Sequence, residues 1–191
     1  RVEFNNSGNI AATTFNGIPL YTNDNSIYTH NVSATDSSAV QNAAYGIEAM
    51  DAITTGDANV AIGFKAASLL NTGYDNTIVG AYAGDALTSG NNNVAVGHLA
   101  LSTEDAHGKN VAIGASALQT LNAGADAFNT AVGYLAGTAM TTGINNTIIG
   151  GLAGDAINTG NQNVAVGKAS LTSATTASDN VGVGHGALST L

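Results

Sequence analysis

The side chains best suited to chemistry stand together in the stretch from Ser102 to Asn110. Glu104, Asp105, His107 and Lys109 lie within six consecutive residues there. Paired carboxylates beside a histidine could perform acid–base catalysis, and the same oxygen and nitrogen donors could bind a cation. The competing interpretation, which we prefer, is that this stretch is a solvated turn that has diverged from its neighbours.

The remaining carboxylates are dispersed along the chain. Asp57, Asp75 and Asp179 come just before short apolar segments, and Asp85 and Asp155 come after them. Calcium-binding rolls carry a denser Gly-Gly-x-Gly-x-Asp pattern, and a glycan hydrolase needs two carboxylates roughly 5 to 9 Å apart. Neither arrangement is marked in the sequence, so we expect no catalytic residue, no metal site and no cofactor.

A second set of candidates consists of exposed-type residues at positions that vary between copies of a repeat. Tyr82, His98, Tyr134 and Lys168 fall there and could bind a glycan by stacking and hydrogen bonding. The alternative is that these positions vary because nothing constrains them. The sequence leaves both interpretations open.

The elements that would position these residues come from the repeat itself, which is an asparagine followed four residues later by a glycine. The spacing between copies is seventeen residues, except for one copy of nineteen at 110–128, and a degenerate copy runs from Asn42 to Gly46. The two extra residues lie in the stretch from Gly124 to Asn129, which indicates a loop before the next strand. The repeated asparagines are Asn59, Asn76, Asn93, Asn110, Asn129, Asn146, Asn163 and Asn180.

Each copy has two halves with different patterns. The first half alternates β-branched residues with alanine, as in Val94, Ala95 and Val96, and this pattern predicts a buried strand whose alanine face is closely approached by a partner. In the second half small or apolar residues recur at spacings of three and four, as in Ala66, Ala67 and Leu70. This spacing favours a helical turn slightly over a second short strand.

A unit of seventeen residues cannot bury its own apolar face, so neighbouring copies must stack. We predict a mainly β repeat solenoid, a parallel β-roll or β-helix, over about nine copies in residues 42–191. The asparagines would form a ladder along it, and the glycines would allow a tight corner or positive φ. Three such rods would pack through their small residues into a homotrimer. Residues 1–41 lack the repeat and predict a β-rich cap or adaptor.

Composition narrows the classes of partner. The net charge is −9, only four residues are Lys or Arg, and no cysteine is present. Nucleic acids and anionic membranes both require clustered cations, and no apolar run reaches the ~20 residues of a membrane span. We expect neither nucleic-acid binding nor membrane insertion. Because the chain ends within a copy of the repeat, we expect it to be part of a longer protein.

The motif Asn-[Val/Thr]-[Ala/Ile]-[Val/Ile]-Gly-x-x-Ala-[Leu/Gly], with its Thr-Gly and Asn-rich links, resembles the repeats of bacteriophage tail-fibre proteins over residues 42–191. The core Asn-Val-Ala-Val-Gly is more loosely similar to the head repeats of trimeric autotransporter adhesins, which are shorter. The first resemblance implies a trimeric, non-enzymatic fibre segment of a virion that spaces or presents host-receptor-binding parts. Its partners would be neighbouring fibre or tail proteins and a bacterial surface glycan or protein. The second implies a bacterial cell-surface adhesin, and a glycan-degrading tailspike is the third alternative.

Overall fold

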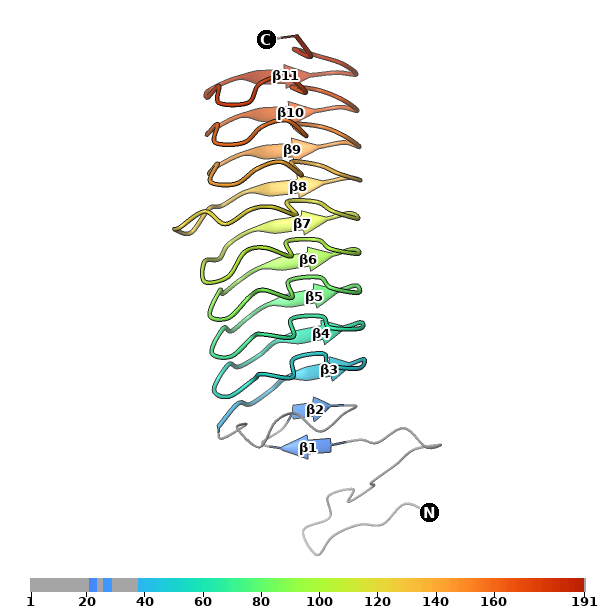
Figure 1. The fold of residues 1–191 in the computed structure, drawn as a ribbon, viewed down its shortest axis with the longest axis vertical. Coiled ribbons are helices and arrows are strands. Elements are labelled where there is room, and N and C mark those ends of the chain that lie inside the picture. The colour runs from blue at the N-terminus through green and yellow to red at the C-terminus, as the bar shows by residue number, and fades with distance from the viewer. Residues whose placement is uncertain (1–20, 24–25, 29–37, 191) are drawn as a thin grey trace, which may run out of the picture.

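The computed structural model describes residues 21–23, 26–28 and 38–190, which form a parallel β-solenoid with its coils stacked along one axis (Figure 1). The strands are β1 (Tyr21–Asn23), β2 (Ser26–Tyr28), β3 (Ala43–Tyr45), β4 (Val60–Ile62), β5 (Thr77–Val79), β6 (Val94–Val96), β7 (Val111–Ile113), β8 (Thr130–Val132), β9 (Thr147–Ile149), β10 (Val164–Val166) and β11 (Val181–Val183). They make one sheet in chain order. The predicted fold class is confirmed.

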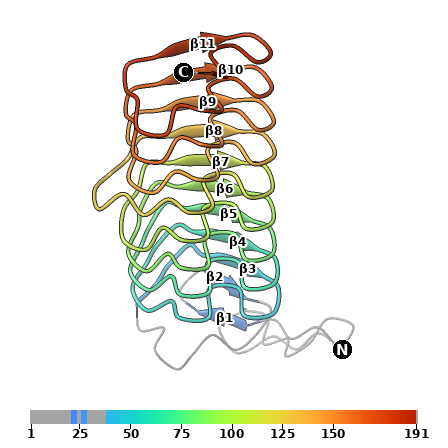
Figure 2. The same cartoon turned by 45° about the horizontal axis from the view of Figure 1, so that its top comes forward.

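The strands pair in the register that the repeat dictates. From β2 onward every neighbouring pair is parallel, and equivalent residues face each other, as Val94 faces Val111. The two extra residues leave this register intact, because Val111 still pairs with Thr130 across the longer coil. Figure 1 shows the longer loop projecting on the left between β7 and β8. Figure 2 shows the turns of successive coils lying over one another as the strands do.

Strands β1 and β2 lie within the segment predicted to be a cap. They pair antiparallel with each other, and β2 pairs in parallel with β3. Since β3 also pairs with β4, both of its edges are hydrogen-bonded. Most of the remaining residues of the predicted cap lie outside the described part of the chain.

The middle residue of each solenoid strand points into the coil. Ala61, Ala95 and Ala112 are buried against the turn residues of the same solenoid, while the β-branched residues on either side face outward and are partly or fully exposed. The prediction that alanine faces a partner chain, and that rods pack through these small residues, is therefore wrong. In most coils the small side chain lies inside and the larger ones lie outside, whereas β5 and β9 carry Ile78 and Ile148 inside.

The interior stays filled because a larger inward residue on the strand is matched by a smaller residue on the facing turn. Where the inward strand residue is large, the facing turn residue is glycine: a Cβ on Gly84 would lie 3.2 Å from Cδ1 of Ile78, and one on Gly154 would lie 3.2 Å from Cδ1 of Ile148. Close packing of this kind requires that one side chain shrink when the other grows.

The second half of each copy is a series of turns. Residues 38–190 contain no helix, and no second strand forms in this half, so the favoured helical turn is wrong. Lys65 and Ala67 have φ values of 57° and 51°, which interrupt any helix. The N–H of Lys65 bonds to the carbonyl of Ile47 in the preceding coil, and that of Ala67 bonds to Ala83 in the following coil, both at 2.9 Å. A helix would need these groups for bonds within its own segment.

The glycine after each strand makes the corner that brings adjacent coils together. Gly97 has a φ of 137°, and a Cβ there would lie 2.5 Å from the carbonyl oxygen of Gly114 in the next coil. Both the positive φ and the backbone contact exclude a side chain, which confirms the role predicted for these glycines.

We therefore expect Gly97→Ala to lower the free energy of unfolding by about 3 kcal/mol or more, because strain and a backbone clash add. Gly151→Ala is the matched control, since the nearest atom to its Cβ would be the backbone carbonyl oxygen of Tyr134 at 3.9 Å. It should change the free energy of unfolding by less than about 0.5 kcal/mol. Urea denaturation followed by circular dichroism measures both. Equal effects of the two substitutions would contradict this account of the corner.

Candidate functional site

The repeated asparagines form a continuous ladder inside the rod. The backbone N–H of each one, from Asn59 to Asn180, donates to Oδ1 of the asparagine one coil before, at distances between 2.9 and 3.2 Å. The first step starts from Asn42 in the degenerate copy. Asn59 to Asn163 are all buried, so these bonds are shielded from water.

The same side chains also close their own coils. Nδ2 of Asn76 donates to the carbonyl of Gly90, fourteen residues later in the same coil, at 2.8 Å, and to Oδ1 of Asn59 at 3.0 Å. Asn110 differs: its Nδ2 donates to Oδ1 of Asn93 and to the carbonyl of Gly108, and within residues 38–190 it makes no bond across its own coil, which carries the two extra residues. The ladder side chains are fully engaged in holding coils together, so they are structural.

Glu104 occupies a position that is apolar in most other coils. The equivalent residues are all buried, and Glu104 itself is 0% exposed. They are Ile53, Leu70, Leu87, Leu121, Met140, Ile157 and the smaller Ala174. The expectation of a solvated turn is correct for the exposed Asp105 but wrong for Glu104. The alignment of Glu104 with Leu87 and Leu121 is the sequence signal that indicates its burial.

The carboxylate of Glu104 takes the place of a backbone hydrogen bond that joins the turns of adjacent regular coils. In the regular coils a backbone bond joins equivalent turn residues, as when Asn71 donates to the carbonyl of Thr88 at 2.8 Å. Within residues 38–190, no such bond joins Asp105 to Asn122, where the longer loop begins. Instead Oε2 of Glu104 accepts from the N–H of Ala123, and Oε1 accepts from the N–H of His107, each at 3.2 Å.

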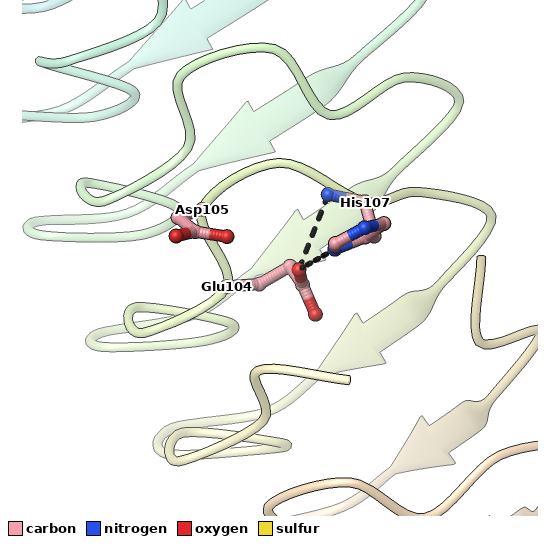
Figure 3. Close-up of side chains that lie close together, drawn as sticks. All are labelled: Glu104, Asp105 and His107. Carbon is pink, nitrogen blue, oxygen red and sulfur yellow. Dashed lines mark hydrogen bonds and ion pairs between the residues drawn. The ribbon is translucent and has the colours of Figure 1, made fainter. Parts of the chain in front are cut away.

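The other members of this cluster are arranged around Glu104 (Figure 3). Nδ1 of His107 lies 3.4 Å from Oε1 of Glu104, is buried, and has no hydrogen-bond partner in the described chain. Glu104, Asp105 and His107 offer ligand atoms within 4.8 Å of one another, and they are the one such group of three found in residues the structure describes. Both Glu104 oxygens accept backbone N–H groups, so this carboxylate clamps the start of the longer loop to the preceding coil.

Lys109 belongs to a second contact across the longer loop. Its Nζ lies 2.7 Å from Oδ2 of Asp126, whose Oδ1 accepts from the N–H of Gly108 at 3.1 Å. The hydrogen bond from the Lys109 side chain lowers the pKa of Asp126. The Lys109 ammonium also lies 5.0 Å from the centre of the Phe128 ring. Together with the bond from Ala123 to Glu104, these contacts fasten both ends of the loop to the preceding coil.

Among the dispersed aspartates, Asp57 and Asp75 lie in adjacent coils, where the N–H of Asp75 donates to the carbonyl of Asp57 at 3.1 Å. Asp57 accepts from the N–H of Val40 at 2.8 Å and so links two coils. Asp85 and Asp155 lie on turns four coils apart, and partial burial raises the pKa of each. Asp85 and Asp155 are therefore too far apart to form the carboxylate pair that glycan hydrolysis requires.

Two of the four candidate recognition residues are brought together. The ring centroids of Phe64 and Tyr82 are 5.2 Å apart and those of Tyr82 and His98 are 6.3 Å apart, both in edge-to-face geometry. The Lys65 ammonium lies 5.6 Å from the Phe64 ring centre and pairs with Glu48 at 3.3 Å. Residues from three successive coils therefore form one aromatic row at the corner after the strand.

Tyr134 and Lys168 stand apart from this row. Small residues, Ala115 and Gly151, occupy the equivalent position in the coils between His98, Tyr134 and Lys168. Tyr134 is 61% exposed, and the Lys168 residue is also exposed. The structure thus joins Tyr82 and His98 with Phe64 but leaves Tyr134 and Lys168 outside this row.

Comparison with known proteins adds no relative: no protein-family model, curated protein or solved structure matches this chain. Among the residues described, there is no helix with the length and apolar character to span a membrane.

The ladder predicts a large effect of removing the amide donors. Asn76→Asp keeps an acceptor for Asn93 and the backbone bond to Asn59, but it removes the two Nδ2 bonds to Asn59 and Gly90 and places a charge against their oxygens. We expect a loss of about 2–4 kcal/mol at pH 7 in urea denaturation, since each unsatisfied buried group costs about 1–3 kcal/mol. Asn92→Asp, at an exposed position where Asp75 and Asp179 stand in other coils, should change little. A similar loss in both variants would contradict the ladder's role.

The loop clamp predicts that Glu104→Gln lowers the free energy of unfolding by about 1–3 kcal/mol, because an amide has one acceptor and would turn an N–H₂ toward a backbone donor. Asp105→Asn is the exposed neighbour control and should change it by less than about 0.5 kcal/mol. Melts of the wild type in EDTA and in added Ca²⁺ or Zn²⁺ should coincide. A metal-dependent shift that Glu104→Gln abolishes would assign a metal site instead.

Proposed function

We propose that this chain is a structural, non-enzymatic segment of a virion tail fibre. It acts as a stiff homotrimeric rod that spaces or presents parts that bind a receptor on the bacterial surface. The observation that carries the proposal is the unbroken ladder from Asn42 to Asn180, which ties each coil to the next through buried hydrogen bonds. A uniform, internally bonded rod resists bending and keeps whatever it carries at a fixed distance.

The distribution of polar groups supports a non-catalytic role. The buried asparagines are used to join and close coils, and the one fully buried carboxylate among the described residues, Glu104, clamps a loop. The aromatic row Phe64, Tyr82 and His98 lies on the outside, where it could contact a glycan or protein receptor. Neighbouring fibre or tail proteins would be the other partners.

The second candidate is the head domain of a trimeric bacterial surface adhesin. It is supported by the Asn-Val-Ala-Val-Gly core of the repeat, seen at Asn93–Gly97 and Asn163–Gly167, together with the parallel roll that these segments form. Both candidates assign the same mechanical role to the rod and differ in what anchors it. A glycan-degrading tailspike is the third candidate.

The proposal predicts a trimer of rods, each on the order of 40 Å long over the nine repeat strands at ~4.8 Å per strand. Native mass spectrometry and small-angle X-ray scattering measure these two quantities. Incubation with a panel of bacterial surface polysaccharides should release no oligosaccharides. A stable monomer would contradict the trimer, and release of oligosaccharides that Glu104→Gln leaves unchanged would indicate a tailspike activity elsewhere on the rod.

A further inference from the structure

The outward side of strands β4 to β11 is an almost continuous apolar surface, which we call the sheet face. It consists of the first and third residues of these eight strands, of which thirteen are Val or Ile and three are Thr. The first column is Val60, Thr77, Val94, Val111, Thr130, Thr147, Val164 and Val181, and the second is Ile62, Val79, Val96, Ile113, Val132, Ile149, Val166 and Val183. No charged side chain stands in either column.

This face is open to solvent in the single chain. Ile62, Ile113 and Ile149 are 43%, 38% and 40% exposed, and the other members are partly buried only through their neighbours or are exposed. The solvent side of an antiparallel sheet usually carries polar residues, and all-parallel sheets are generally covered on both faces. A parallel sheet with one face buried by its own coil and the other apolar and open therefore lacks a cover.

From these observations we infer that copies of this chain bury the sheet face against one another. This inference rests on the self-associating rod of the proposed function and names the surface through which it associates. The alanines that the sequence favoured for this contact are already inside the coil.

The dimensions of the sheet face suit such a contact. Eight strands spaced ~4.8 Å apart and two columns ~7 Å apart outline a flat area on the order of 270 Å², before the width of the side chains and the flanking residues are counted. A stable interface buries about 800 Å² on each partner, which is within reach once the side chains along both edges are included.

Periodicity favours a second copy as the occupant. Side chains on the sheet face recur at the strand spacing along the whole solenoid, and another copy has the same spacing, so side chains could interdigitate at every coil. A partner with a different repeat would lose this match after a few coils. The net charge of −9 also lies off the sheet face, so like charges are not forced into the contact.

The test replaces two residues of the sheet face in the full chain and compares them with two off it. Ile62→Lys with Ile113→Lys changes the coils of β4 and β7, and Leu69→Lys with Thr120→Lys is the control in the same two coils at exposed turn positions. Sedimentation velocity over a range of concentrations should show that the wild type and the control associate. The sheet-face variant should dissociate at concentrations at least 100-fold higher.

Circular dichroism shows whether each variant is folded. If the lysine variant is not, Ile62→Thr with Ile113→Thr retains β-branched residues like Thr77 and Thr130 and should still weaken association about tenfold. Undiminished association of a folded sheet-face variant would overturn this inference and leave the proposed fibre intact. A wild type that stays monomeric at every concentration would overturn both.

Discussion

The hydrogen bond from one asparagine's N–H to the side-chain oxygen of the asparagine before it is the constraint on which the rest of the rod depends. Because the asparagine is buried and also closes its own coil through Nδ2, a coil must return the chain to the same point after each circuit. Length can change only where that return is unaffected. The coil from Asn110 to Phe128 satisfies this condition, since Asn129 still donates to Asn110 at 3.2 Å.

The backbone conformation follows from the same close stacking. Equivalent coils lie one strand spacing apart at every point, so N–H and carbonyl groups of the turns must be directed along the rod toward neighbouring coils. Lys65 and Ala67 meet this requirement by adopting left-handed conformations and bonding in opposite directions along the rod. The corner at Gly97 brings two backbones so near that no Cβ fits between them.

The period, the ladder and the glycine corner could be predicted from the sequence because each uses a residue type that is specific to its role. The turn conformation could not, since spacings of three and four place Ala66, Ala67 and Leu70 on one side in a helix and in a series of turns alike. The sequence did not show which face of each strand points into the coil, because both faces are apolar. The inward face is indicated by the pairing of Ile78 with Gly84 and of Ile148 with Gly154, because a larger residue at the strand position goes with a smaller one at the facing turn position.

Glu104 shows why an irregular coil tolerates a charge where other coils need an apolar side chain. A buried carboxylate is stable only if donors surround it, and a regular coil has few to spare because its turn N–H groups bond to neighbouring coils or within their own coil. The longer loop removes the backbone step between Asp105 and Asn122 and leaves the N–H of Ala123 available to Glu104. The loop and the carboxylate therefore depend on each other. Without Glu104 the loop would leave the N–H of Ala123 without an acceptor, and without the loop the buried carboxylate would lack this donor.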